Sequence, residues 1–283
     1  MGKSGVPGAR WIRAGAVIGL VLSALACGDA PRPAWTTLHA GLELGEFPAP
    51  EESRQGDSRI HVLRVDPRLY ELRLLAASAP GNGKSMTARE WCQAHGLVAA
   101  INAGLFGEDG TTPVSLARTR AHTANGHLTR DKAVLAFDPL DPGAPPVQII
   151  DREHQQFEEL RERYGSFVQS IRMVSLGGEN VWDPQPRRHS VAAIAIDRGG
   201  FVLLIHSQSP FSVHDLIDAL LELPLSIRNA MYLEGGPLAQ LFVRAGGSER
   251  EFVGLAEGAL LQHDEVAAGP IPNVLGVARR AER

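Results

Sequence analysis

Cysteine is scarce in this sequence, and its scarcity excludes a fold held together by disulfides and a cysteine-based zinc site. The 283 residues include two cysteines, Cys27 and Cys92. Cys27 belongs to a targeting sequence, described below, which leaves Cys92 without a partner for an intramolecular disulfide. No cysteine–histidine spacing indicates a zinc site, so we expect neither a metal nor another cofactor. Cys92 falls in a helical pattern and is predicted to be a buried apolar side chain rather than a nucleophile.

An excess of charge of one sign is also absent. The formal net charge is −4, and basic residues are scattered apart from short clusters such as Arg187-Arg188 and Arg279-Arg280. A surface that binds nucleic acid needs concentrated positive charge. We therefore expect no nucleic-acid partner.

The apolar run near the N-terminus is too short to span a bilayer comfortably, which needs about 20 apolar residues. It covers residues 14–26 and follows the basic residues Lys3, Arg10 and Arg13, an order that is typical of a signal peptide. The run ends in Ser23-Ala24-Leu25-Ala26-Cys27-Gly28, the pattern at which bacterial lipoproteins are cleaved and acylated on cysteine.

This pattern predicts the cellular location. We expect a lipoprotein signal peptide over residues 1–26, lipidation of Cys27, and a tether over residues 27–36. The exported protein would then be anchored in a membrane of the bacterial envelope by its N-terminal lipid, on the periplasmic or outer-membrane face. The alternative is an ordinary signal peptide with Cys27 incidental, which would give a secreted protein.

Residues 37–283 are long enough for one domain with a substantial core, and the pattern of short apolar runs indicates its class. Strands are predicted over 59–66 and 70–77, paired across the turn Asp66-Pro67-Arg68, and over 190–197 and 201–207, paired as a hairpin. Helices are predicted after the capping residues Thr87 and Ser212, and over 153–164. We predict an α+β fold: a single domain with a mixed, largely antiparallel β-sheet core flanked by helices.

Two strand ends combine a polar residue with following glycines. The first is Asn102, which follows the apolar residues 97–101 and precedes Ala103-Gly104. Its amide could hold a sugar hydroxyl or a phosphate oxygen. Alternatively, it bonds the backbone of the adjacent loop, a common task for asparagine beside glycine.

The second strand end is Glu234, which follows the apolar strand 229–233 and precedes Gly235-Gly236-Pro237. A carboxylate at the end of a buried strand is partly desolvated, which raises its pKa and favours proton transfer. Paired glycines let the backbone approach a ligand closely, and their amides can bind an anion. Alternatively, Glu234 is a solvated turn residue.

These segments, in this order, resemble the phosphodiester glycosidase family. The resemblance covers about residues 60–277. It is carried by five blocks: Thr87-Ala88-Arg89-Glu90-Trp91 through Asn102-Ala103-Gly104-Leu105-Phe106, then Val114-Ser115-Leu116-Ala117, Gln169-Ser170-Ile171-Arg172-Met173-Val174, Met231-Tyr232-Leu233-Glu234-Gly235-Gly236-Pro237, and Pro270-Ile271-Pro272-Asn273-Val274-Leu275.

The resemblance implies a hydrolase that cleaves a sugar–phosphate phosphodiester on the sugar side, with an envelope or extracellular glycan as substrate. Glu234 and Asn102 would be catalytic, and Arg172 could bind the phosphate as a bidentate fork, unless it forms only a surface salt bridge. The other residues expected to bind substrate are Gln169, Ser170, His189, Ser190, Gly235 and Gly236. We expect Asn102, Arg172 and Glu234 to converge on one cleft.

Several positions depart from the family pattern. Glu234 replaces the usual aspartate, and Pro237 stands where a third glycine is common, which removes one amide from an anion-binding loop. Glycosidases usually need two carboxylates, and the second is not evident here; Glu108 and Asp109 are the nearest candidates. These departures keep a second hypothesis open, a non-catalytic carbohydrate-binding envelope lipoprotein with the same fold.

Overall fold

A computed structural model describes residues 1–2, 35–256 and 266–281. Cys27 and nearly all of the predicted signal peptide and tether lie outside these residues. Within them, no helix is both long enough and apolar enough to cross a membrane. Residues 33–283 belong to one compact unit, and the description below concerns this unit.

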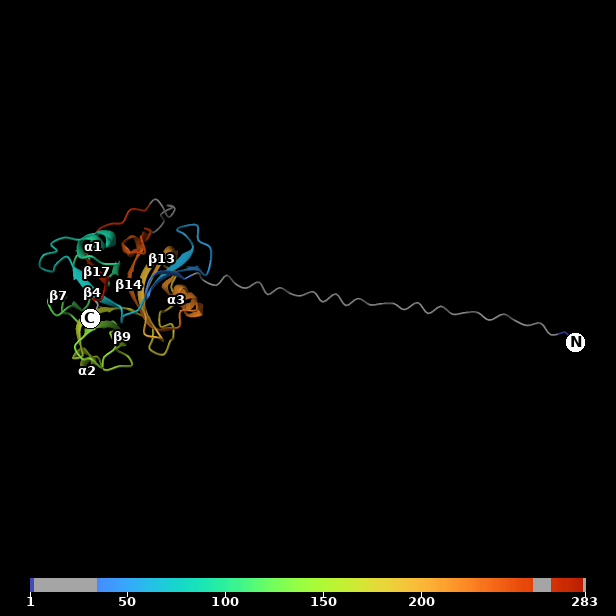
Figure 1. Cartoon of the computed structure of the whole chain (residues 1–283), viewed down its shortest axis with the longest axis horizontal. Helices are drawn as coiled ribbons and strands as arrows, with labels where there is room; N and C mark the ends of the chain where they lie inside the picture. The colour runs from blue at the N-terminus through green and yellow to red at the C-terminus, as the bar shows by residue number, and fades with distance from the viewer. Residues whose placement is uncertain (3–34, 257–265, 282–283) are drawn as a thin grey trace. The chain divides into compact units, whose positions relative to one another are not determined.

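Seventeen strands form three antiparallel sheets in the described part of the unit (Figure 1). The first has seven strands in the order β1 (Thr36–His39), β2 (Leu42–Pro48), β3 (Arg59–Val65), β13 (Val202–Phe211), β12 (His189–Asp197), β14 (Ile227–Gly235) and β11 (Arg172–Val174). The second has five, in the order β7 (Thr123–Asn125), β6 (Ala117–Arg118), β10 (Tyr164–Ser170), β8 (Ala133–Pro139) and β9 (Val147–Asp151). The third also has five, in the order β16 (Ser248–Val253), β15 (Gln240–Ala245), β5 (Ala99–Asn102), β17 (Asn273–Arg279) and β4 (Tyr70–Ala76).

The three sheets share one apolar core. Leu63 from the first sheet, Leu135 from the second and Leu275 from the third are fully buried in the same cluster. The opposite face of the seven-stranded sheet is covered by α3 (Val213–Glu222), whose Leu216 and Leu220 lie in a second cluster. Because this sheet is buried on both faces, β12 and the first half of β13 have the continuous apolar runs Val191–Ile196 and Val202–Ile205 rather than alternating patterns.

Helices are few and short. Besides α3, the described residues contain α1 (Ala88–His95), which packs on the third sheet, α2 (Phe157–Arg161) and the 3₁₀ turn η1 (Gly236–Leu238). The predicted capping box of α1 is confirmed: Thr87 accepts from the Glu90 amide, and the Glu90 carboxylate accepts from the Thr87 amide. The predicted cap of α3 is also confirmed, since Ser212 accepts from the amide of Asp215 at 3.1 Å.

The prediction that the strands are largely antiparallel is confirmed. The prediction of one mixed sheet is wrong. Every pairing between named strands is antiparallel, and three sheets replace the one that was expected. The hairpin of β12 and β13 is confirmed. The pairing of residues 59–66 with 70–77 is wrong, because β3 pairs with β2 and β13 while β4 pairs with β17. The turn at Asp66 thus carries the chain from one sheet into another.

The predicted helix over residues 153–164 is also shorter than expected. Only Phe157–Arg161 is helical, its N-cap Gln156 makes no side-chain hydrogen bond, and Tyr164 already begins β10. Phe157 is its one buried residue, so it lacks the apolar face that stabilises a longer helix. Cys92, by contrast, is buried in α1 as predicted, and burial raises the pKa of its thiol to about 12.

One end of the seven-stranded sheet gathers several chain segments. Strand β12 begins there, and its antiparallel neighbours β13 and β14 end there. The loop between β2 and β3 reaches the same end, because Ile60 at the start of β3 pairs with Ser207 near the end of β13. Residues far apart in the sequence therefore meet at this end of the sheet.

Candidate active site

A cavity of about 360 Å³ lies where β14 ends and β12 begins. Among the described residues, Glu234 is the one acidic residue that lines it, and Trp182 and Tyr232 are the aromatic ones. The described lining consists of Leu105, Ile171, Trp182, Gln185, Arg187, His189, Tyr232, Glu234, Gly235, Gly236 and Pro237. The cavity therefore combines one carboxylate with aromatic and cationic side chains.

A β-bulge in β14 brings Tyr232 and Glu234 to this cavity. Glu234 pairs with Ala192 and Tyr232 pairs with Ala193, so Leu233 is an extra residue between two consecutive partners. Leu233 is fully buried in the core shared by the sheets. Bulges are frequent beside active sites because they redirect a side chain without ending the strand.

Glu234 has an unusual electrostatic environment. Burial raises the pKa of its carboxyl to about 7, and a hydrogen bond from the Gly235 amide to Oε1, 2.9 Å long, partly opposes this shift. No described residue forms an ion pair with it. A carboxyl with this pKa can either hold or accept a proton near neutral pH, which suits acid–base catalysis.

Gly235 must be glycine because two cavity residues occupy the space beside its Cα. A Cβ there would collide with Tyr232 Oη and would lie 2.6 Å from His189 Nδ1. Burial and the Glu234 charge both raise the pKa of the Tyr232 phenol, which therefore keeps its proton and can donate a hydrogen bond into the cavity. The Trp182 and His189 rings lie 5.5 and 6.1 Å from the Tyr232 ring.

Asn102 lies at the end of β5, as predicted, but it does not line this cavity. The residue is fully buried, its Nδ2 donates to Leu238 O at 2.8 Å, and its Oδ1 accepts from Gln240 N at 2.7 Å. These hydrogen bonds match the alternative interpretation of Asn102, in which its side chain bonds loop backbone. Asn102 fixes the chain that leaves Gly235-Gly236-Pro237, so we assign it a positioning role.

Arg172 also lies outside the cavity. Its Nη1 donates to Asp151 Oδ1 at 2.6 Å, and 16% of its side chain is exposed. The prediction that Asn102, Arg172 and Glu234 converge on one cleft is therefore wrong. In the register of the sheet, Arg172 pairs with Met231, three residues before Glu234, and its side chain reaches β9 instead.

The remaining predicted substrate-binding residues divide into two groups. His189, Gly235 and Gly236 line the cavity. Gln169, Ser170 and Ser190 are buried and do not. The Gln169 side chain bonds the backbone of Thr129 and Asp131, and the Ser190 hydroxyl donates to Gln208 O and accepts from Leu255 N. Both serve the backbone around them.

Neither candidate for a second carboxylate lies in the cavity. Glu108 and Asp109 are exposed in the loop after β5. Asp109 accepts from the amides of Thr111 and Thr112 and from the Thr112 hydroxyl, and the bonds to Thr112 are the main reason that its pKa lies far below the usual value. Asp109 thus stabilises its own turn. No cluster of three or more potential metal ligands occurs among the described residues.

Sequence reasoning missed several lining residues, notably Trp182, Gln185 and Arg187. All three come from the segment before β12, which has no periodic pattern. The sequence offered one signal for Arg187: it stands two positions before His189, which was itself a predicted substrate-binding residue. Tyr232 was quoted only as part of a motif, although it precedes Glu234 by two positions in a strand.

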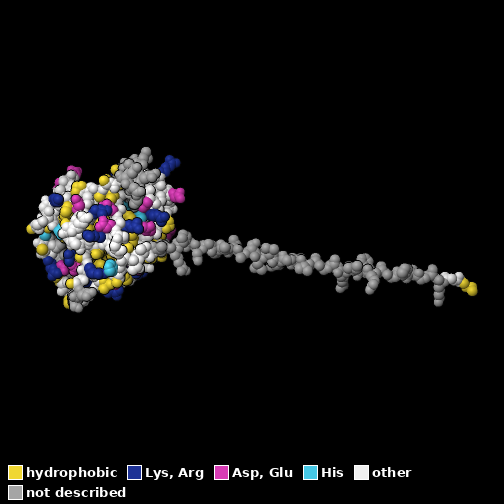
Figure 2. All heavy atoms as spheres, turned by 45° about the horizontal axis from the view of Figure 1, so that its top comes forward, with side chains coloured by type: hydrophobic (Ala, Val, Ile, Leu, Met, Phe, Trp, Pro, Cys, Tyr) yellow, Lys and Arg dark blue, Asp and Glu magenta, His cyan; other side chains and the backbone are white. Residues whose placement is uncertain are grey.

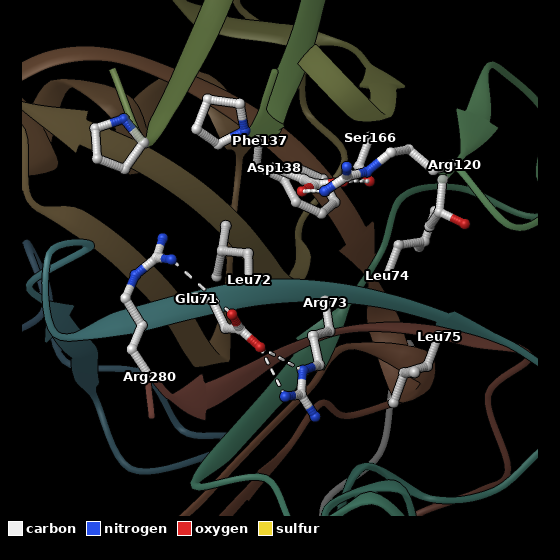
Figure 3. A pocket seen from close by; sticks show the side chains of 13 residues that line it. Glu71, Leu72, Arg73, Leu74, Leu75, Arg120, Phe137, Asp138, Ser166 and Arg280 are labelled. Carbon is white, nitrogen blue, oxygen red and sulfur yellow. Dashed lines mark hydrogen bonds and ion pairs between the residues drawn. The ribbon is translucent and has the colours of Figure 1, made fainter. Parts of the chain in front are cut away.

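A larger cavity, of about 570 Å³, lies between β4 and the second sheet and contains none of the predicted residues. Its charged side chains are paired with one another (Figure 3): Arg73 with Glu71, and Arg120 with Asp138, while Arg280 lies 3.9 Å from Glu71. Each of these charged groups thus already has an ionic partner within the protein, so we place the chemistry at Glu234.

The fold and the Glu234 cavity together define an antiparallel β-sheet protein with a carboxyl of raised pKa at the end of a central strand. The chain belongs to the phosphodiester glycosidase family, whose sequence model matches residues 95–278. This confirms the family resemblance seen in the sequence, and members of this family act as hydrolases.

Solved structures show the same fold. The catalytic domain of zebrafish N-acetylglucosamine-1-phosphodiester alpha-N-acetylglucosaminidase, auto-inhibited by its pro-peptide, is 13% identical, with a TM-score of 0.63 over 88% of each chain. A hypothetical protein from Synechocystis is 16% identical, with a TM-score of 0.58 over 89% of this chain and 64% of its own. No curated protein matches the sequence.

The bonds of Asn102 lead to a stability prediction. Asn102→Ala leaves Leu238 O and Gln240 N without partners inside the protein, and we expect the free energy of unfolding to fall by about 1–3 kcal/mol. Urea denaturation measures the loss. Asn102→Asp keeps an acceptor for Gln240 N but sets a carboxylate oxygen against Leu238 O in a fully buried site, so at neutral pH it should lose at least as much stability. Wild-type stability combined with abolished turnover would instead give Asn102 a direct catalytic role.

The pKa of Glu234 leads to a pH prediction. The folded state holds this proton up to about pH 7, whereas the unfolded chain releases it near pH 4.5. Between these values the unfolded state binds fewer protons, so the stability of the wild type falls as the pH rises. Glu234→Gln lacks this titration. The stability of the wild type relative to this variant should decrease by on the order of 1–3 kcal/mol across the window; a constant difference would contradict the raised pKa.

Proposed function

We propose that this protein hydrolyses the glycosidic bond between a sugar and the phosphate of a phosphodiester, in a glycan of the cell envelope or outside the cell. The observation that carries the proposal is Glu234, a partly desolvated carboxyl with a pKa of about 7, in a cavity lined by aromatic side chains and Arg187. Family membership supports the hydrolase class.

Glu234 is suited to act as the base in this reaction. Water attacks the anomeric carbon, the bond from that carbon to the phosphate oxygen breaks, and Glu234 takes the proton of the water. The phosphate leaves with the electron pair of the broken bond. Because a phosphate ester is stable as an anion, its departure does not need a second carboxylic acid to protonate it. This accounts for a cavity whose described lining holds one carboxylate where glycosidases usually hold two.

Arg187 and His189 are placed to stabilise the charge of the phosphate. Arg187 forms no ion pair with any described residue, so its guanidinium is available for two phosphate oxygens. His189 Nδ1 donates to Ser190 O at 2.9 Å, which leaves Nε2 directed elsewhere for a ligand. In this proposal Arg187 takes the role that the sequence suggested for Arg172.

The test is hydrolysis of a panel of sugar 1-phosphodiesters that differ in the sugar, with the released reducing sugar measured. We expect the wild type to turn over at least one of them and Glu234→Gln to lose about 100-fold or more in kcat. Because Glu234 acts as a base, kcat should increase with pH and level off above about 7. Glu234→Asp is the matched control, since it keeps a carboxylate of the kind usual in the family.

The same panel addresses the rival function. If the wild type binds these compounds in calorimetry but releases no sugar from any of them, the hydrolase proposal fails and a non-catalytic carbohydrate-binding protein takes its place.

The proposal includes export and anchoring through lipid on Cys27, on the basis of the N-terminal sequence. In a bacterial host, we expect the wild type to partition into the detergent phase of a Triton X-114 extract and Cys27→Ser to partition into the aqueous phase, because acyl chains supply the membrane affinity. Ala26→Ser, which leaves the cysteine in place, is the control. Equal partitioning of wild type and Cys27→Ser would show that Cys27 is incidental.

A further inference from the structure

A second cavity, of about 450 Å³, adjoins the Glu234 cavity at the same end of the seven-stranded sheet. Arg187 and His189 line both cavities. The lining of the second cavity also includes Arg54 and Arg188. A ligand long enough to pass Arg187 and His189 would therefore occupy both.

The loop between β2 and β3 forms one wall of this second cavity and is fixed to the sheet. Ala49 N donates to Ser58 O at 2.9 Å, which closes the loop, and Ser58 N donates to Ser209 Oγ at 2.8 Å. Gly56, with a φ of +74°, lies so close to Ser209 that a Cβ would be 2.7 Å from its Oγ. These contacts hold Arg54 at the cavity.

The charged side chains among the described residues that line the second cavity are all of one sign. Its lining includes Arg54, Arg187 and Arg188, and none of the described residues that line it is acidic. Arg188 is largely neutralised, because its Nη1 bonds Glu51 at 2.5 Å and its Nη2 lies 3.9 Å from Asp215. Arg54 and Arg187 form no ion pair within the described part of the chain. Two guanidinium groups thus remain available to a ligand.

Two other regions of the surface carry both signs of charge. On the face drawn in Figure 2, dark blue and magenta side chains are interspersed rather than separated, and the charged residues of the 570 Å³ cavity are paired. The separation of positive from negative groups at the second cavity therefore distinguishes it from these regions and indicates an anionic ligand.

We infer, on the basis of the proposed function, that the second cavity binds the leaving-group side of the substrate and that this side carries an anion of its own. The sugar lies in the Glu234 cavity against Trp182 and Tyr232, and the scissile phosphate lies at Arg187 and His189. The alcohol esterified to that phosphate extends toward Arg54. The substrate class is then a sugar 1-phosphodiester whose alcohol component bears a further phosphate or carboxylate group.

The test compares three phosphodiesters of one sugar, in which the phosphate is esterified to propanol, to propanediol monophosphate or to hydroxypropanoate. We expect the wild type to prefer the two anionic substrates by about five- to tenfold in kcat/KM, the effect of one additional partly exposed charge-assisted bond. Their relative rates distinguish phosphate from carboxylate. Arg54→Gln should remove most of the preference through KM, with kcat little changed.

Arg198→Gln is the matched control, because Arg198 is exposed and lies beyond the opposite end of β12 from His189. This variant has the same loss of charge and should retain the full preference. Equal kcat/KM for the three substrates in the wild type, or equal loss of preference in Arg198→Gln and Arg54→Gln, would overturn the inference while leaving the hydrolase function intact.

A binding measurement separates this inference from the proposed function. Propanediol bisphosphate, which has no sugar, should bind the wild type in calorimetry about five- to tenfold more tightly than it binds Arg54→Gln. If no phosphodiester is hydrolysed and this difference is observed, the hydrolase proposal fails and the anion site stands. If the bisphosphate binds both proteins equally, the anion site is excluded.

Discussion

The desolvation of the Glu234 carboxyl is the constraint on which the rest of the site depends. A carboxyl at an ordinary pKa would be ionised and hydrated at neutral pH and would be a poor base. Burial raises the pKa of Glu234 to about 7, where proton affinity and ionised fraction are balanced. Removing water from a charged group costs stability, so the surrounding sheet must hold the carboxyl in place against that cost.

Three features of the fold hold it. The bulge at Leu233 anchors the strand in the core shared by the sheets, which lets Tyr232 and Glu234 both face the cavity. Gly235 allows the backbone to pass beside Tyr232 and His189, where a side chain would collide. Beyond the glycines, Asn102 bonds the returning chain from the neighbouring sheet. A polar residue outside the Glu234 cavity thus holds the chain that follows the two glycines.

The local patterns of the sequence predicted much of this arrangement. Strand ends followed by glycine identified Glu234 and Asn102, and capping residues identified α1 and α3, because these features depend on neighbours along the chain. The partner of a strand, in contrast, does not depend on the residues next to it along the chain. Nothing near Asp66 shows that β3 and β4 belong to different sheets. That outcome depends on strands far away in the sequence, because β3 forms its backbone hydrogen bonds with β2 and β13, and β4 forms its own with β17.

The same limit explains why the sequence indicated Arg172, and not Arg187, as the phosphate-binding residue. Both lie near candidate blocks, and both could bind phosphate by chemistry alone. Arg172 finds Asp151 at 2.6 Å, whereas Arg187 finds no carboxylate among the described residues. A guanidinium is available to a substrate only if the fold leaves it unpaired. That property depends on the side chains that tertiary structure brings near it, which the sequence around each arginine does not specify.

Under the proposed function, the linings of the two cavities also bear on which bond is broken. Trp182 and Tyr232 line the Glu234 cavity and not the second one, Arg54 lines only the second one, and Arg187 and His189 line both. A sugar against the aromatic rings and an alcohol toward Arg54 would place the phosphate between them, at the two residues that the cavities share. In that arrangement the anomeric carbon lies in the same cavity as the Glu234 carboxyl, and Arg187 receives the charge that the departing phosphate carries away. The proposal therefore expects the carbon–oxygen bond, and not the phosphorus–oxygen bond, to be broken.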